Sequence, residues 1–374
     1  MSRKIVVVGG GYGGTEVIRQ LINRGVRNIE IELISNKRNF ENTIGGVEII
    51  SEKVKPDELR YDLTELSSYW NFSLTIDSVE SVDLNRKVVK TENKEKDYDA
   101  LIVAIGSEPN FFNIGGTDLA LTAYSLSDFG VINERLKQLN RDSPNVVIVG
   151  AGFVGLEVAA EVLDLFKAMK KDVKVTVVEK MNSVLPAYNN DIAKKIAFEH
   201  FTSRGVKIIL GKGVKQIEKE KVVLEDENPI ETDLTIWTAG IKSSRTASKI
   251  VGASLYRGYI EVDEKLLITG AKDSFAMGDV AFVKINGKDA QKMAGEALEQ
   301  GKTVAKNISL IANGQKPNFS HVINYTTDFP KVLLSMGKGK AMLIFGSQYV
   351  STGATEYFLK KRVDVDEIMG RFPQ

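Results

Sequence analysis

The chain has 374 residues, enough for two or three domains, and its 43% hydrophobic and 26% charged content is typical of a folded protein. Its 50 Lys and Arg nearly balance its 49 Asp and Glu, which excludes the strongly basic surface of a nucleic-acid-binding protein. The absence of cysteine excludes structural disulfides, thiolate metal sites and electron transfer through a protein thiol. His200 and His321 have no partner at ligand spacing, so no metal site is predicted.

The beginning of the sequence leads straight into a strand and a glycine turn. No separate apolar signal segment precedes that strand, and no stretch approaches the roughly 20 apolar residues of a transmembrane helix. We therefore expect a cytoplasmic protein.

Residues 1–35 indicate one strand–helix–strand unit. Residues 4–8 are an apolar, β-branched run typical of a buried parallel strand, a helical pattern covers residues 15–23, and residues 29–34 form the next strand. Between them, Gly9, Gly11 and Gly14 have the G-x-G-x-x-G spacing of a dinucleotide-binding turn. There the first glycine permits a tight turn, the second lets the backbone approach a pyrophosphate, and the third allows close helix packing.

The acidic residue that usually follows such a unit is missing from the first one. Its place is taken by Ser35 and Asn36, which can hydrogen-bond ribose hydroxyls but more weakly than a carboxylate can. We predict these two residues as ribose contacts.

The same unit recurs about 140 residues later, after strand-like stretches at residues 74–90 and 97–104. A strand over residues 145–149 is followed by the turn of Gly150, Gly152 and Gly155, a helix over residues 156–169 and a strand over residues 173–179. Glu179 ends that strand. A carboxylate there accepts from both ribose hydroxyls and repels a 2′-phosphate, which favours NAD over NADP, although Lys180 weakens this preference.

Two dinucleotide sites in one chain indicate hydride transfer between two cofactors, a nicotinamide and a flavin. The predicted fold is α/β, with two Rossmann-like domains and a smaller C-terminal α+β region. We expect an FAD-binding domain over residues 1–115 and 236–315, an NAD-binding domain over residues 116–235, and the C-terminal region over residues 316–374. Within that last part, residues 332–336 and 341–345 are strand-like and residues 352–369 are helical.

Three further segments resemble the two-dinucleotide-binding flavoprotein superfamily of pyridine nucleotide oxidoreductases, and the likeness spans nearly the whole chain. Residues 101–110 (LIVAIGSEPN) and 233–244 (DLTIWTAGIKSS) look like its two "ATG" segments, and residues 274–281 (SFAMGDVA) look like its late "GD" motif. The resemblance implies that Asp279 hydrogen-bonds the ribitol chain of FAD. It also implies that these residues contact FAD or NAD: Ala104, Gly106, Phe153, Val154, Ala239, Gly240, Gly278 and Ala294.

Within this superfamily, the lack of cysteine excludes the disulfide reductases and the sulfide:quinone reductases. Residues 39–48 (NFENTIGGVE) and 55–63 (KPDELRYDL), with Trp237, are more similar to the branch of type II NADH dehydrogenases and sulfide:quinone reductases than to reductases of small electron carriers. The resemblance therefore implies that NADH reduces FAD, which passes electrons to a quinone. A small carrier protein or dioxygen as acceptor, and a redox-sensing protein, are the alternatives.

One stretch departs from that family. Its members carry an AQxAxQQG-like stretch with glutamines near the quinone, and residues 294–301 here read AGEALEQG. Gly295 removes one amide and Glu299 replaces the other by a charge, so the acceptor stays open.

Glu157 is the candidate catalytic residue. The resemblance implies that it lies close to the flavin, where it would position the nicotinamide or relay a proton; the alternative is a carboxylate stabilised by the helix dipole. The helical tail, with Lys360, Lys361 and Arg362 among apolar residues, suits either an amphipathic helix on the cytoplasmic face of a membrane or a docked helix that could form a homodimer contact.

Overall fold

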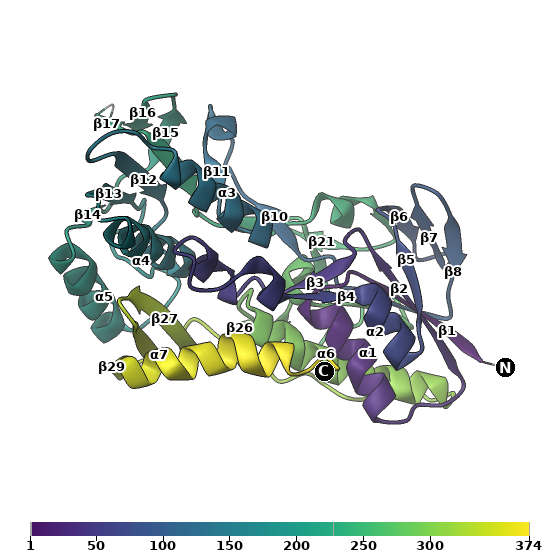
Figure 1. Cartoon of the computed structure of the whole chain (residues 1–374). Coiled ribbons are helices and arrows are strands. Elements are labelled where there is room, and N and C mark those ends of the chain that lie inside the picture. The colour runs from purple at the N-terminus through teal and green to yellow at the C-terminus, as the bar shows by residue number, and fades with distance from the viewer. Residues whose placement is uncertain (1, 227, 374) are drawn as a thin grey trace.

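The computed structural model describes residues 2–226 and 228–373. Two five-stranded sheets lie apart in Figure 1, the first on the right and the second on the left. All neighbouring strands of the first sheet are parallel. Its strands, in spatial order, are β23 (Ser274–Ala276), β9 (Ala100–Val103), β1 (Arg3–Val8), β2 (Ile29–Ser35) and β5 (Ser73–Ile76).

The second sheet is also parallel throughout. Its strands, in spatial order, are β11 (Leu121–Thr122), β18 (Leu234–Trp237), β12 (Asn145–Val149), β13 (Lys174–Val178) and β14 (Lys207–Ile209). Helices cover both sheets, which explains why their central strands are continuous apolar runs. The prediction of an α/β fold with two Rossmann-like sheets is confirmed.

The helix after each glycine turn begins three residues earlier than predicted. Helix α1 (Tyr12–Asn23) includes Gly13 and Gly14, and α4 (Phe153–Ala168) includes Gly155. The glycines lower helix propensity, but close packing overrides it: a β-carbon on Gly13 would lie 2.6 Å from the methyl carbon of Met277. Further α-helices before the C-terminal region are α2 (Leu63–Trp70), α3 (Leu126–Lys137), α5 (Asp191–Ser203) and α6 (Ala294–Ala312).

Small antiparallel units extend each half of the molecule. On the first half, β6 (Val79–Asp83), β7 (Val88–Thr91) and β8 (Glu95–Asp97) form a meander that β20 (Ile250–Val251) joins. On the second half, β15 (Val214–Ile217), β16 (Lys221–Leu224) and β17 (Pro229–Glu231) form another. Two short strands, β10 (Ser107–Pro109) and β19 (Ile241–Ser243), pair where the chain passes between the halves.

The C-terminal region joins the two halves. Strands β27 (Lys331–Gly337), β28 (Lys340–Phe345) and β29 (Tyr349–Gly353) form an antiparallel sheet, and both α4 and α7 (Ala354–Lys361) pack on β27. From α7 a π-helical stretch, η6 (Arg362–Glu367), continues to the first half. Figure 1 shows this yellow segment running along one side of the molecule, from below the second sheet to α1 and α6.

Candidate functional site

The two glycine turns have nearly the same geometry. The φ angle is +109° at Gly9 and +107° at Gly150, in the region that favours glycine. Each turn also lies tightly against the segment beside it. A β-carbon on Gly9 would lie 2.2 Å from the carbonyl oxygen of Ala104, and one on Gly150 would lie 2.9 Å from the Cα of Ala239. The structure therefore places each ATG-like segment directly at a glycine turn.

The third glycine of each turn also has a packing reason. A β-carbon on Gly14 would lie 2.0 Å from the carbonyl oxygen of Gly9, and one on Gly155 would lie 2.0 Å from that of Gly150. Since these neighbours are backbone atoms, no side chain fits without moving the turn.

The second glycine of each turn is required neither by a positive φ angle nor by close packing. Gly11 (φ −86°, ψ −164°) and Gly152 (φ −72°, ψ −170°) have extended backbones that any residue adopts, and a β-carbon on either would meet no atom within 4 Å. Both are N-caps whose helices begin with free backbone N–H groups, and neither has a side-chain cap. Open space at a helix N-terminus fits a pyrophosphate group, so both turns suit a dinucleotide.

Asp279 lies beside the ATG-like segment that packs against the first turn. Its Oδ2 accepts a hydrogen bond at 2.8 Å from the hydroxyl of Ser107, the residue that follows Gly106. Burial raises the pKa of the Asp279 carboxyl. The neighbouring Gly278 has a φ of +71°, and its N–H donates to Oε1 of Gln300 on α6 at 2.7 Å. The GD turn, the first ATG-like segment and α6 thus meet at one place.

The two predicted ribose contacts of the first unit differ in exposure. Ser35 is buried at the end of β2, where its hydroxyl accepts from the N–H of Lys37 at 3.1 Å and donates to the carbonyl of the same residue at 2.8 Å. Asn36 is exposed. Ser35 therefore shapes the turn after the strand, and the ribose contact stays a prediction.

Glu179 is buried directly after β13, one residue beyond the strand that the pattern extends through it, and its ribose contact stays a prediction. Its Oε2 accepts from the N–H of Ala151 in the glycine turn and its Oε1 from the N–H of Met181, both at 2.8 Å. The Lys180 ammonium extends away to Glu225 at 2.7 Å. The carboxylate therefore holds the second turn in shape, and the lysine is paired elsewhere.

Glu157 lies in a buried ionic cluster between the two halves. Its Oε1 accepts from the N–H of Ser335 on β27 at 2.7 Å and lies 3.0 Å from the ammonium of Lys360 on α7, which also binds the Asp364 carboxylate. Burial raises the pKa of Glu157 to about 7, although Lys360 opposes this. Burial lowers the pKa of Lys360, but the two carboxylates outweigh it and leave the pKa raised.

The sequence prediction missed the partners of Glu157. Lys360 and Asp364 have the i, i+4 spacing of a helical ion pair, which was a visible signal, but nothing local links them to residue 157. A second cluster lies one turn further along α4, where Glu161 pairs with Lys53 at 2.7 Å. Together these ion pairs connect α4 with the C-terminal region and with the segment after η1 (Gly45–Ile49).

The remaining predicted cofactor contacts flank these turns. Phe153 begins α4 and lies 5.6 Å, ring centroid to nitrogen, from the Lys360 ammonium, and Val154 follows it. Gly240 has a φ of +124°, and Ala294 is the first residue of α6. No contact here tests their roles, which stay predictions.

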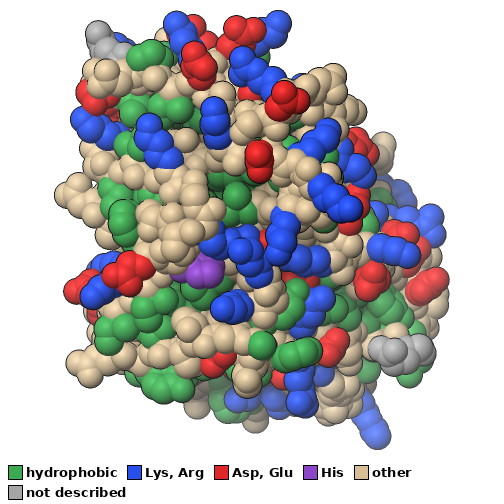
Figure 2. Space-filling view, turned by 60° about the vertical axis from the view of Figure 1, so that its left-hand side comes forward, with side chains coloured by type: hydrophobic (Ala, Val, Ile, Leu, Met, Phe, Trp, Pro, Cys, Tyr) green, Lys and Arg blue, Asp and Glu red, His purple; other side chains and the backbone are tan. Residues whose placement is uncertain are grey.

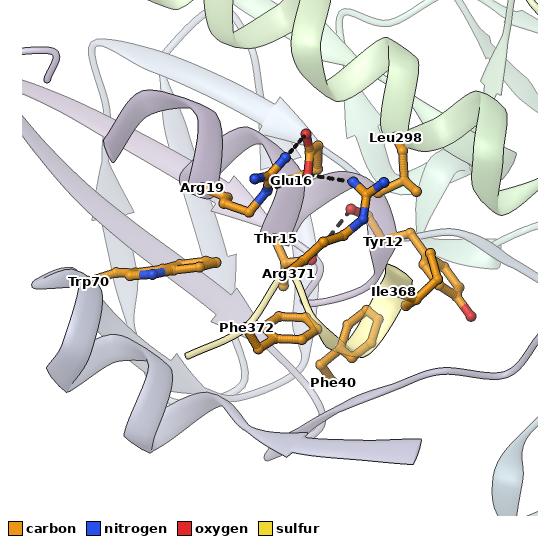
Figure 3. A pocket seen from close by; sticks show the side chains of 10 residues that line it. All are labelled: Tyr12, Thr15, Glu16, Arg19, Phe40, Trp70, Leu298, Ile368, Arg371 and Phe372. Carbon is orange, nitrogen blue, oxygen red and sulfur yellow. Dashed lines mark hydrogen bonds and ion pairs between the residues drawn. The ribbon is translucent and has the colours of Figure 1, made fainter. Parts of the chain in front are cut away.

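The segment after η6 is anchored in an aromatic cluster beside α1. Phe372 is buried, with ring centroids 4.7 Å from Phe40, 4.9 Å from Tyr61 and 6.2 Å from Trp70. Figure 3 shows this ring among its neighbours. It also shows the adjacent Arg371, whose guanidinium lies 3.1 Å from the carboxylate of the buried Glu16 on α1. The C-terminal segment is therefore docked on the first half.

Comparison with known proteins agrees with this geometry. A family model described as pyridine nucleotide-disulphide oxidoreductase matches residues 3–322. The type II NADH:quinone oxidoreductase of Staphylococcus haemolyticus is 26% identical, over 97% of this chain and 94% of its own. The apoptosis-inducing factor homolog A of Dictyostelium discoideum is 25% identical, over 85% and 79%.

Two solved structures share the fold. The sulfide:quinone oxidoreductase of Aquifex aeolicus and the NDH2 of Plasmodium falciparum with NADH both give a TM-score of 0.84, at 18% and 17% identity. They match 99% of this chain and 92% and 98% of their own chains. This chain has no cysteine, so it has no thiol for disulphide chemistry. From the match over residues 3–322, the chain belongs to the pyridine nucleotide-disulphide oxidoreductase family.

Proposed function

We propose that the protein is an FAD-dependent NADH dehydrogenase that transfers a hydride from NADH to FAD and passes the electrons to a quinone. The observation that carries the proposal is the pair of matching glycine turns, each with open space at its second glycine. The first turn and Asp279 would hold FAD, and the second turn and Glu179 would hold NADH. FAD supplies the hydride acceptor and the later release of electrons. The relatives named type II NADH:quinone oxidoreductase support the quinone.

Glu157 is proposed as the residue that holds a proton at the junction of the two halves. Its pKa of about 7 means that it carries a proton in part of the neutral range, and the adjacent Lys360 supplies a fixed positive charge. From the helix of the second glycine turn, it would position the nicotinamide or relay a proton.

The first test is anaerobic addition of NADH to the FAD-loaded protein. The yellow flavin absorbance should bleach with one equivalent of NADH, and NADPH should react more slowly because Glu179 repels a 2′-phosphate. E179Q should narrow the difference between the two nucleotides. A flavin that stays oxidised with NADH would disprove the proposal at its first step.

A small carrier protein or dioxygen is the second candidate acceptor. One observation favours these acceptors over a quinone, namely that neither Gly295 nor Glu299 carries an amide side chain. The Glu299 carboxylate is half exposed and pairs with the Lys302 ammonium at 2.6 Å. Steady-state turnover with a soluble quinone analogue, with a small iron–sulfur carrier and with dioxygen distinguishes the acceptors. Faster turnover with the carrier or with dioxygen than with the quinone would replace the quinone in the proposal.

We further propose that the protein works at the cytoplasmic face of a membrane, through the outward side of α7. None of the helices in residues 2–226 and 228–373 is long and apolar enough to cross a bilayer. On α7, however, Phe358 is 73% and Leu359 41% exposed, and Arg362 follows them. Of the predicted basic run, Lys360 is instead buried against Glu157 and Asp364, and Lys361 lies 3.5 Å from the Glu48 carboxylate, which leaves Arg362 as the exposed cation. Figure 2 shows further Lys and Arg side chains, with Asp and Glu among them, on the face turned forward from the left of Figure 1. Such a surface attracts anionic lipid.

Flotation with anionic vesicles tests this attachment. F358S should lower the bound fraction. F319S, which removes another exposed phenylalanine in the segment after α6, should change it little. If F358S leaves vesicle binding unchanged but makes a dimer dissociate in sedimentation, the exposed side of α7 is a homodimer contact.

A further inference from the structure

Tyr325 lies directly against the first turn of α6, in the space that a side chain at position 295 would occupy. A β-carbon on Gly295 would lie 2.7 Å from the Tyr325 hydroxyl oxygen and 2.8 Å from the ring carbon that bears it. Any side chain at position 295 would push the phenol away from the helix. The glycine that departs from the AQxAxQQG-like pattern is therefore what allows a tyrosine hydroxyl to lie there.

A buried carboxylate fixes the backbone of this tyrosine. Oε2 of Glu296 accepts from the N–H groups of Asn324 and Tyr325, at 3.0 and 3.1 Å, and Oε1 lies 2.6 Å from Nε2 of His321. Glu296 is 1% and His321 3% exposed. Because hydrogen bonds to a buried carboxylate are strong, residues 321–325 are held firmly to α6.

The same helix connects this segment with the GD turn. Gln300, one turn after Glu296, donates from Nε2 to Oε1 of Glu296 at 3.4 Å and accepts from the N–H of Gly278 at 2.7 Å. A continuous chain of buried hydrogen bonds thus runs from the residue beside Asp279 to the backbone of Tyr325.

The Tyr325 hydroxyl is free to donate. Its side chain is half-buried, and across residues 2–226 and 228–373 no hydrogen bond ends on its oxygen. Burial raises the pKa of this phenol, and the carboxylates of Glu299 and Glu296 raise it further, against Arg371. The hydroxyl therefore keeps its proton at neutral pH.

We propose that Tyr325 orients the electron acceptor, by donating a hydrogen bond from its hydroxyl to a carbonyl oxygen of a quinone, and that Glu296 is its positioning residue. The inference rests on the proposed function, because it requires a quinone that binds beside α6. The second glycine turn and α4, which would hold NADH, belong to other elements. Loss of the hydroxyl should therefore affect reoxidation of the flavin and leave its reduction unchanged.

The test separates the two half-reactions of the FAD-loaded protein. Y325F is compared with wild type and with Y349F, which removes a hydroxyl from a tyrosine that is 56% exposed on β29. Stopped-flow reduction by NADH should be equal in all three. Reoxidation by a soluble quinone analogue should be about 3- to 10-fold slower in Y325F alone, the fold-change expected from one lost hydrogen bond. Reoxidation by ferricyanide, which needs no carbonyl contact, should be unchanged.

Two further variants test the positioning. The Glu296 carboxylate has four hydrogen-bond partners, and E296Q replaces one of its two acceptor oxygens by an NH2 group. E296Q should therefore raise the KM for the quinone analogue without slowing reduction by NADH. G295A should do the same by displacing the phenol. Equal reoxidation of Y325F and Y349F by the quinone overturns this inference alone. If the quinone fails to reoxidise even the wild-type flavin, the proposed acceptor and this inference both fall.

Discussion

Gly152→Ala is the substitution that most directly tests for a nucleotide at the second turn. The new methyl would point into space with no atom within 4 Å, and the backbone of Gly152 is already in a region open to alanine. Alanine is a poorer N-cap than glycine, but it also reduces the entropy of the unfolded chain, and each effect is worth about 0.5–1 kcal/mol. Since these effects oppose each other, the melting temperature should move by no more than about 3 °C.

Nucleotide binding should respond quite differently. The methyl occupies the approach of a pyrophosphate to the helix N-terminus, and overpacking of this kind costs about 1–3 kcal/mol. That corresponds to a roughly 5- to 150-fold higher Kd for NADH, measured by fluorescence titration, with FAD content unchanged. G130A, on α3 and also in open space, is the matched control. If NADH bound to G152A as tightly as to G130A, the open space would not be the nucleotide site.

Three other substitutions probe packing and charge. G155A should lower the free energy of unfolding by about 1–3 kcal/mol in urea, because its methyl would lie 2.0 Å from the carbonyl oxygen of Gly150; unchanged stability would contradict this geometry. K360M should cost about 3–5 kcal/mol by leaving Glu157 buried without a cation. In the wild type, the pKa of Glu157 is about 7 in the folded state and 4.5 ordinarily. Between pH 4.5 and 7 the folded state therefore binds a proton that the unfolded state has lost, so the free energy of unfolding falls as the pH rises through this range. The K360M deficit should therefore be larger at pH 8 than at pH 5.5, and a deficit independent of pH would count against the ion pair. F372A should cost about 3–5 kcal/mol in the same assay, as for other buried phenylalanines, and a loss below about 1 kcal/mol would mean that this ring does not anchor the segment.

The fold was predictable because its signals are local. Each nucleotide unit combines an apolar strand, a glycine turn and an amphipathic helix within about 35 residues, and the structure has both units where the pattern puts them. The helix starts were wrong by three residues, because Gly13, Gly14 and Gly155 have low helix propensity but pack inside the first helical turns.

The contacts between the halves could not be predicted from the sequence. Glu157 and Lys360 are about 200 positions apart, and no periodicity relates them. No sequence pattern relates Gly295 to Tyr325 either. The missing side chain at position 295 was a reason to question the electron acceptor, but it did not indicate that the Tyr325 ring fills the space. Such contacts depend on how separately formed elements pack against one another, and local secondary-structure propensity does not determine that packing.

The docked C-terminal segment has a consequence for the order in which the molecule is completed during synthesis. The second sheet uses residues 121–237, whereas the first requires β23 at residues 274–276, so the sheet that begins first is finished second. Lys360 and Phe372, which tie the segment to α4 and to the aromatic cluster beside α1, emerge from the ribosome later still. A nascent chain therefore has the strands of both parallel sheets before it has the segment that joins the two halves.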